Sequence, residues 1–169
     1  MNYKTEIENL VLRDAEPSDA GTIYNLIRGI AEYEKMLDEV TATEEDIRES
    51  IFVRNEAAVI LAEYNGETAG FALYFRNYST FLGRANMYLE DLFVYPHMRG
   101  KGIGKALFMA VANAAYSRGD ERMDWVCLNW NTPSIEFYKS MGAKAMSDWT
   151  VYRLDREALC RLAEKEDEK

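Results

Sequence analysis

A glycine-rich loop at residues 99–105, RGKGIGK, is the segment whose residue types point most directly to chemistry. It follows an apolar run at residues 87–94 and precedes a segment with helical periodicity. Closely spaced glycines let the backbone approach a phosphate group, and the first N–H groups of a helix point toward it with a favourable dipole. The sequence therefore predicts a pyrophosphate site at this loop.

The spacing of the glycines distinguishes between kinds of phosphate site. A dinucleotide fingerprint requires Gly-x-Gly-x-x-Gly, but counting from either Gly100 or Gly102 the third glycine is missing. A P-loop fails as well, because Lys105 is followed by Ala106 where Ser or Thr is needed. The pattern that remains is Arg-x-x-Gly-x-Gly, at Arg99, Gly102 and Gly104.

Apolar periodicity predicts the elements that position this loop. Strands are expected over residues 10–15, 57–64, 68–75, 87–94, 123–128 and 149–154. Helices are expected from a cap at Ser18 or Asp19 to about residue 33, from Thr43 through residue 51, over residues 103–119 and 133–141, and around Leu159 and Leu162. Asn65-Gly66 is a hairpin signal, and the later strand–helix–strand order requires a crossover, so the fold class is a mixed α/β (α+β) domain.

The composition indicates one domain over residues 1–169, with residues 164–169 as a charged, frayed tail. The chain has 169 residues, of which 48% are apolar and 29% charged. It carries 20 basic and 29 acidic residues, a net charge of −9, which repels phosphate backbones and disfavours nucleic-acid partners. A cationic small molecule suits this balance better, although a negative charge by itself only promotes solubility.

The small numbers of histidine and cysteine residues disfavour several functional classes. There is one histidine, His97, and there are two cysteines, Cys127 and Cys160, so neither a metal site nor a Ser-His-Asp triad is expected. Two cysteines suit a reducing compartment. With no signal-like start and no apolar run of about 18 residues, we expect a cytoplasmic protein without membrane contact.

In their order along the chain, the motifs YLEDLFV, RGKGIG and WN-x-PS-x-x-FY resemble the GCN5-related N-acetyltransferase (GNAT) superfamily. The N-terminal segment AEYEKMLDEVTATEEDI is similar to its spermidine/spermine (diamine) acetyltransferase branch. The resemblance implies a mixed, mostly antiparallel twisted sheet flanked by helices and splayed at the acetyl-CoA site. It also implies a homodimer.

The resemblance implies acetyl-CoA as the acetyl donor. The backbone of Leu92, Phe93 and Val94 would hold the pantetheine arm and the acetyl carbonyl, and the loop would hold the phosphates. The implied loop residues are Arg99, Gly100, Lys101, Gly102, Ile103, Gly104 and Lys105. At the next strand–helix junction, the resemblance implies further cofactor-binding residues: Asn131, Thr132, Pro133, Ser134 and Tyr138. Thr132 stands where the branch has Glu.

Two residues are expected to move protons. An alkyl amine with a pKa of about 10.4 is mostly protonated at neutral pH, so a base must remove a proton before the amine attacks the thioester. Glu90 matches this role, directly or through a water. Asp91 is expected on the opposite face of the strand by alternation, as a structural partner. Tyr138 occupies the family position of the general acid that protonates the CoA thiolate.

A diamine or polyamine acceptor, such as putrescine, spermidine or spermine, needs acids and aromatic faces around its charges. The matching residues are Tyr33, Glu34, Glu90, Asp124, Trp125, Val126, Asp148 and Trp149. Residues 78–80, Tyr-Ser-Thr, lack an acid that the branch can carry there, which keeps thialysine or another lysine-like amine as an alternative.

Three other interpretations stay open at this point. Cys127 could carry the acyl group in a ping-pong scheme, although an apolar strand cysteine more often packs inertly. The chain could be a non-catalytic acyl-CoA-binding regulatory domain, which would not need Tyr138 and Glu90. The acceptor could also be a protein lysine or N-terminal amine.

Overall fold

The computed structural model describes residues 2–164, and the tail predicted over residues 164–169 lies outside the described residues from residue 165 on. The chain forms two compact units, Met1–Val126 and Cys127–Lys169, and each is described by itself. The first unit holds the sheet and the glycine loop. The second holds two helices, α4 (Thr132–Ser140) and α5 (Arg156–Glu164).

A six-stranded sheet forms the centre of the first unit, and its strands follow one another in space in chain order. All neighbours are antiparallel except the last pair, β5 and β6. Only this parallel pair needs a crossover, and α3 (Ile103–Ser117) provides it. The strands are β1 (Asn2–Tyr3), β2 (Leu10–Asp14), β3 (Ala58–Tyr64), β4 (Glu67–Ser79), β5 (Arg84–Val94) and β6 (Met123–Asp124).

The β3–β4 hairpin turns at Asn65-Gly66, as the sequence predicts. Both residues have positive φ, 53° and 80°, which matches the right-handed twist of the two strands. Tyr64 then lies opposite Glu67, and this register places Val59 and Leu61 on the same face as Phe71. The hairpin therefore fixes which apolar side chains enter the core.

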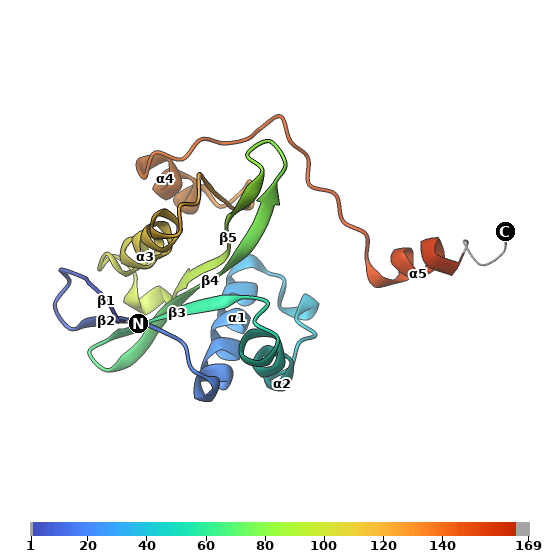
Figure 1. Ribbon diagram of the computed structural model, residues 1–169. Coiled ribbons are helices and arrows are strands. Elements are labelled where there is room, and N and C mark those ends of the chain that lie inside the picture. Colours follow the sequence, from blue (N-terminus) through green and yellow to red (C-terminus); the bar gives the residue numbers. More distant parts are fainter. Residues whose placement is uncertain (1, 165–169) are drawn as a thin grey trace. The chain divides into compact units, whose positions relative to one another are not determined.

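Helices cover both faces of this sheet (Figure 1). The first, α1 (Ala20–Glu34), packs Ile23 and Leu26 with Phe71 and Phe93 in the core, as its predicted apolar stripe requires. On the other face, Ile103, Leu107, Val111 and Ala115 of α3 are all buried. Since Phe93 belongs to the α1 core and its neighbour Val94 contacts Gly104 of α3, the two helices lie on opposite sides.

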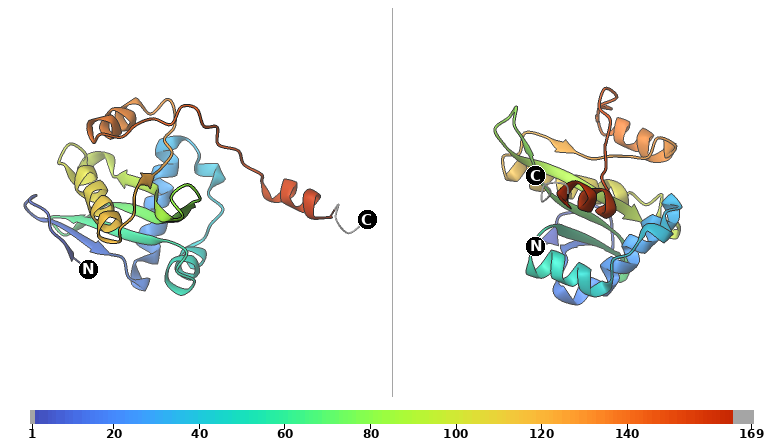
Figure 2. Two further views of the ribbon diagram at one scale, coloured as in Figure 1. Left: turned by 45° about the horizontal axis from the view of Figure 1, so that its top comes forward. Right: turned by 90° about the vertical axis from the view of Figure 1, so that its right-hand side faces the viewer.

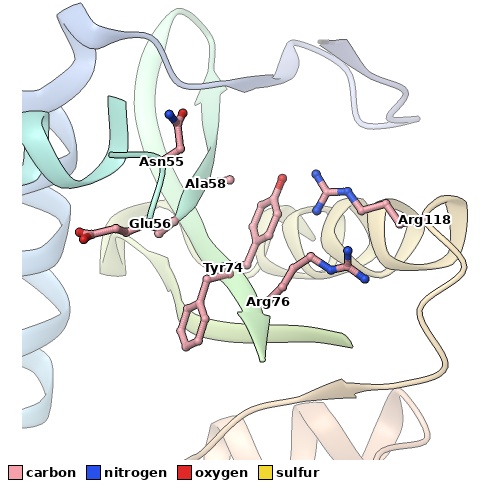
Figure 3. A pocket seen from close by; sticks show the side chains of 8 residues that line it. Asn55, Glu56, Ala58, Tyr74, Arg76 and Arg118 are labelled. Carbon is pink, nitrogen blue, oxygen red and sulfur yellow. The ribbon is translucent and has the colours of Figure 1, made fainter. Parts of the chain in front are cut away.

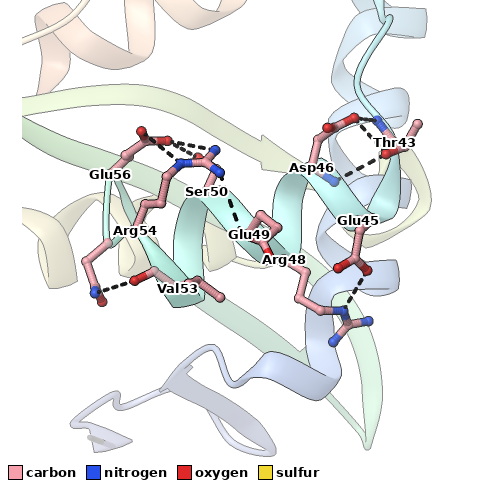
Figure 4. A network of polar contacts seen from close by, with 10 residues as sticks. Thr43, Glu45, Asp46, Arg48, Glu49, Ser50, Val53, Arg54 and Glu56 are labelled. Atoms are coloured by element: carbon pink, nitrogen blue, oxygen red, sulfur yellow. Dashed lines mark hydrogen bonds and ion pairs between the residues drawn. The ribbon is translucent and has the colours of Figure 1, made fainter.

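Short helical elements lie before and after α1, and the last of them adds Ile51 to the α1 core. Three residues, Leu37–Glu39, form the 3₁₀ turn η2, and Pro17–Asp19 form η1 before α1. The predicted cap at Thr43 is confirmed: its Oγ1 accepts from Asp46 N, and Asp46 Oδ2 accepts from Thr43 N at 2.8 Å (Figure 4). Helix α2 (Glu44–Arg48) then widens into a π-helical turn, η3 (Glu49–Val53), which buries Ile51.

Two strand predictions in the C-terminal third are wrong. Of the strand expected over residues 123–128, only β6 forms, and it pairs with β5 at Met87–Met123 and Tyr88–Asp124. The strand expected over residues 149–154 is absent, and the ribbon has no arrow there (Figure 2). Its large apolar side chains are exposed. Strand geometry needs a neighbour to accept its hydrogen bonds, and the apolar pattern alone does not supply one.

The end of pairing between β5 and β6 matters for the site. Beyond Tyr88, the rest of β5 up to Val94 has no partner on the β6 side among the described residues. The splay that the fold class implies therefore begins beside Leu89, where open backbone groups of β5 can meet a ligand.

Candidate active site

A β-bulge in β5 displaces the predicted base, Glu90. Leu73 of β4 lies opposite Asp91, and the next residue, Tyr74, lies opposite Leu89, so Glu90 is an extra residue without a partner in β4. Its side chain is exposed. The prediction that Glu90 and Asp91 point to opposite faces therefore loses its basis, because alternation holds only in a regular strand.

Asp91 is the most perturbed carboxyl group of this region. Its partner Leu73 packs against the α1 core, so Asp91 lies on the α1 face of the sheet. Burial raises the pKa of Asp91 to about 7, and the negative charges of Glu90 and Glu34 add to the shift. Near neutral pH, Asp91 therefore exchanges its proton readily.

Glu34, the last residue of α1, completes this group. Burial raises the pKa of its carboxyl above the ordinary value. We call Glu34, Glu90 and Asp91 the acidic cluster. Three carboxyl groups that repel one another are stabilised by a cation placed among them, so the cluster suits an ammonium group.

Asp124 and Trp125 follow at the sheet edge. Asp124 lies opposite Tyr88, and the charges of Glu90 and Asp124 both raise the pKa of the Tyr88 phenol, after the larger effect of burial. Asp124 also forms an ion pair with Arg122, whose Nε lies 2.8 Å from Asp124 Oδ2. Trp125 packs edge-on against Phe108 of α3, with ring centroids 5.4 Å apart. Asp124 and Glu90 thus both act on Tyr88, while Trp125 packs against α3.

Tyr33 connects α1 to the start of the glycine loop. The Arg99 guanidinium lies 4.5 Å from the centre of the Tyr33 ring and 5.8 Å from that of Phe93. Arg99 Nε also donates to the Val94 carbonyl at 2.9 Å. Arg99, predicted to bind the cofactor, is exposed, and these contacts join the loop to β5 and α1.

The glycine loop has the backbone that a phosphate site needs. Gly100 and Gly102 have φ values of 77° and 81°, and Gly102 is the N-cap of α3, so the first turn of the helix follows directly. A Cβ at Gly100 would meet nothing within 4 Å. Lys105 is in the first turn, and Lys101 Nζ donates to the His97 carbonyl at 3.3 Å. The residues present therefore fit a pyrophosphate, held by helix N–H groups with lysine charges nearby.

Leu92, Phe93 and Val94 form the end of β5, the part without a β6 neighbour in the described chain. The Phe93 and Val94 side chains are buried. Their side chains therefore pack in the core, and backbone contacts to the pantetheine arm stay a prediction. Ile103 is likewise fully buried, so it supplies a backbone N–H and a core side chain.

The second unit carries the other predicted cofactor residues at the start of α4. Asn131 is buried and caps the helix, with its Oδ1 accepting from Ser134 N at 3.4 Å. Thr132 and Pro133 are exposed in the first turn, where Pro costs no hydrogen bond. This helix start is a second set of N–H groups suited to an acyl-CoA ligand.

Tyr138 is half-buried on α4, next to Phe137, with ring centroids 5.3 Å apart. Its carbonyl accepts from Met141 N and Ala143 N, which closes the helix before Gly142. Asp148 and Trp149, also in this unit, lie in a turn with exposed side chains, and Val126 at the end of the first unit is exposed too.

Residues 2–164 contain no group of three or more His, Cys, Asp and Glu side chains arranged to hold a metal ion. No helix in the same range is long and apolar enough to span a bilayer. Cys127 is half-buried, and its Sγ lies 3.7 Å from the Leu128 carbonyl.

Sequence reasoning did not find the proton-binding character of Asp91. The signal was visible as two adjacent acids inside an apolar strand, but a bulge depends on the β4–β5 register, which no short motif encodes. Two arginines at a separate pocket, Arg76 and Arg118, were missed as well, because they lie 42 residues apart in the sequence.

Comparisons with known proteins agree with this geometry. The chain matches the acetyltransferase (GNAT) family over residues 22–143. It is 38% identical to thialysine N-epsilon-acetyltransferase of Bos taurus, over 92% of this chain and 98% of that protein. It is 31% identical to the human spermidine/spermine N(1)-acetyltransferase-like protein 1, over 96% of this chain but 25% of that protein.

A solved structure with a similar fold is aminoglycoside N-acetyltransferase AAC(6')-Iy in complex with CoA. It has a TM-score of 0.70 and 19% identity, over 87% of this chain and 95% of that one. The glycine loop, the sheet that splays beside it and the family match over most of the chain lead to one conclusion. The chain belongs to the GNAT family and is an N-acetyltransferase that uses acetyl-CoA to acetylate an amine.

Proposed function

We propose that this enzyme acetylates a primary amine of a small acceptor that carries a second positive charge. The observation that carries this proposal is the acidic cluster. The negative charges of Glu34 and Glu90 both act on Asp91, whose pKa burial and these charges raise to about 7. An incoming diamine relieves the repulsion between these carboxyl groups, so both binding and proton removal become favourable there.

Lysine-like amines such as thialysine are the first candidates for the acceptor. The bovine relative, which aligns with nearly the whole chain, bears that name. In addition, Tyr78, Ser79 and Thr80 supply no carboxylate to hold the far end of a long polyamine. Diamines and polyamines are the second candidates, supported by the acidic cluster and by the resemblance to the human spermidine/spermine acetyltransferase-like protein.

The reaction proceeds by direct attack in a ternary complex. Glu90 accepts a proton from the bound ammonium group, directly or through a water, and the free amine attacks the acetyl carbon. The new C–N bond forms, the C–S bond breaks, and Tyr138 gives its phenolic proton to the leaving CoA thiolate. The second proton that the acetylated nitrogen loses returns through solvent to the Tyr138 phenolate. Asp91 and Glu34 hold the positive charge of the acceptor, and Tyr33 offers its aromatic face beside them.

The loop at Arg99–Lys105 and the start of α4 bind the acetyl-CoA phosphates and pantetheine arm in this proposal. The family match at residues 22–143 includes residues of both compact units, which supports the proposal of a single acetyltransferase domain. A cytoplasmic location stays a prediction from the cysteine content.

A homodimer is part of the same proposal. Large apolar side chains are exposed along one stretch of the second unit, with 71% exposure for Trp149, 75% for Val151 and 90% for Tyr152. An apolar surface of this kind commonly marks a protein–protein interface, here with a second copy. Light scattering coupled to gel filtration tests it: a mass of one chain at micromolar concentration contradicts the dimer.

The proposed function is tested by thiol release from acetyl-CoA with a panel of amines: thialysine, lysine, putrescine, spermidine, spermine and a basic peptide. We expect the highest kcat/KM with thialysine, lower values with the polyamines, and the lowest with the peptide. A higher kcat/KM with the peptide than with every small amine overturns the acceptor class. No release with any of them overturns this proposal entirely.

A further inference from the structure

A pocket of about 430 Å³ opens in the first unit at the C-terminal end of α3 (Figure 3). Tyr74 and Arg76 of β4 form one wall, and Arg118, the residue that follows α3, forms another. The glycine loop is at the opposite end of the same helix. Since α3 has 15 residues, about 22 Å of helix separates the two places.

Two guanidinium groups face this pocket. Arg118 lies beside the Tyr74 ring, with its Cζ 5.9 Å from the ring centroid, and within residues 2–164 no carboxylate forms an ion pair with it. The nearest anionic influence is that of Asp14, whose carboxyl pKa the Arg118 charge helps to lower. Asp14 Oδ1 already accepts the Tyr3 hydroxyl proton at 2.6 Å. Most of the hydrogen-bonding capacity of Arg118 is therefore open to a ligand.

Arg76 is partly engaged. Its Nη2 donates to Asp120 Oδ1 at 2.5 Å and to the Ala85 carbonyl at 2.9 Å. The side chain of Asp120 is fully buried, and its Oδ2 has no hydrogen-bond partner, so the ion pair with Arg76 holds that charge in place. Arg76 thus has a fixed position at the pocket, and Asp120 balances its charge.

The acid that lines the pocket does not cancel this charge. Glu56 Oε2 accepts from Ser50 Oγ at 2.8 Å, and Glu56 Oε1 accepts from Arg54 Nε at 3.1 Å (Figure 4). Figure 3 shows the Glu56 carboxylate pointing away from Tyr74 and Arg118. Among the charged residues that line the pocket, Arg118 is thus the one without an ion-pair partner in the described part of the chain.

We infer that this pocket binds a small anion with several oxygen acceptors, a phosphate monoester or a polycarboxylate, separately from the acetyl-CoA site. Guanidinium groups present paired N–H donors that match both kinds of anion. The Tyr74 ring supplies a wall, and the volume suits a small metabolite. Such a ligand would contact both β4 and the C-terminal end of α3.

The test is calorimetric titration of the full chain, saturated with CoA, with glycerol phosphate and with citrate at constant ionic strength. CoA occupies the glycine loop, so an anion that still binds must do so elsewhere. We expect one of the two anions to bind. Binding of glycerol phosphate would indicate a phosphate site, and binding of citrate would indicate a carboxylate site. Arg118→Gln should raise the Kd of the bound anion by about tenfold or more. Arg118→Lys should raise it by less, because Lys keeps the charge but loses the paired donors.

Two controls make the result decisive. Arg28→Gln removes an exposed arginine that contacts only Tyr24 among the described residues and should leave the anion Kd unchanged. The CoA Kd of each variant reports whether it is folded. No binding of either anion, binding that CoA displaces, or an unchanged Kd in Arg118→Gln would overturn the proposal.

Discussion

Glu90 and Asp91 are consecutive in β5, but only Asp91 has a partner across the ladder, because the bulge leaves Glu90 unpaired. This relationship gives two neighbouring carboxyl groups different environments, one exposed and one half-buried. Burial and the adjacent charge raise the pKa of Asp91 to about 7. Pairs of carboxyls with separated pKa values commonly divide the roles of proton acceptor and charge partner.

The raised pKa of Asp91 predicts a pH-dependent stability. The folded state binds a proton that the unfolded state releases near pH 4, so the free energy of unfolding falls as pH rises from about 4 to about 7 and levels off above that. Asp91→Asn should remove this slope and raise stability at pH 8 by roughly 2 kcal/mol. Urea unfolding at pH 5 and pH 8 measures it, and equal slopes in both proteins would contradict the assignment.

Replacing Glu90 tests the base. Glu90→Gln keeps the size of the side chain but cannot accept a proton, so kcat at pH 7 should fall about 100-fold or more. At pH 9 the loss should be smaller, since more of the amine is already neutral. Glu67→Gln, which removes an exposed strand carboxylate at the start of β4, should leave kcat unchanged. An equal kcat for Glu90→Gln and the wild type would exclude Glu90 as the base.

Replacing Tyr138 tests the acid. Tyr138→Phe removes only a hydroxyl group, so the fold and the Kd for CoA should stay the same while kcat falls about 100-fold. Tyr116→Phe, at an 83% exposed position of α3, is the matched control and should be silent. Steady-state kinetics with thiol detection measures both variants. An unchanged kcat in Tyr138→Phe would remove this residue from the mechanism.

The glycine loop can be tested against a glycine of the same conformation elsewhere. Gly100 and Gly119 have φ values of 77° and 74°, and a Cβ at either would meet nothing within 4 Å. Alanine at each should therefore cost a similar amount of stability, about 1 kcal/mol. Only Gly100→Ala should also raise the KM for acetyl-CoA, by about tenfold. Equal KM values in the two variants would show that the loop does not contact the phosphates.

The local parts of this structure could be predicted from the sequence. The Asn65-Gly66 hairpin, the Thr43 cap and the buried stripe of α3 each depend on residues close together in the chain. The bulge at Glu90 could not, since it is a property of two strands in register. The strand expected at Trp149 does not form for a related reason. Its apolar pattern suits a strand, but no strand in the described part of the chain pairs with it.

The same distinction applies to the site. The motif predicted the glycine loop, and the structure gives it the expected helix start at Ile103. The acidic cluster joins the end of α1 to the middle of β5, 56 residues apart between Glu34 and Glu90. Each acid was visible in the sequence. Their mutual effect on Asp91 depends on the packing of α1 against the sheet.

The central claim is that Glu90 at the acidic cluster deprotonates an amine that then takes the acetyl group. The most direct measurement follows thiol release and acetylated amine together, by absorbance and mass spectrometry, for the wild type and Glu90→Gln with thialysine. We predict one thiol released per acetylated amine, at a rate about 100-fold lower in the variant at pH 7. Thiol release without acetylated thialysine, or equal rates in the two proteins, would contradict the claim.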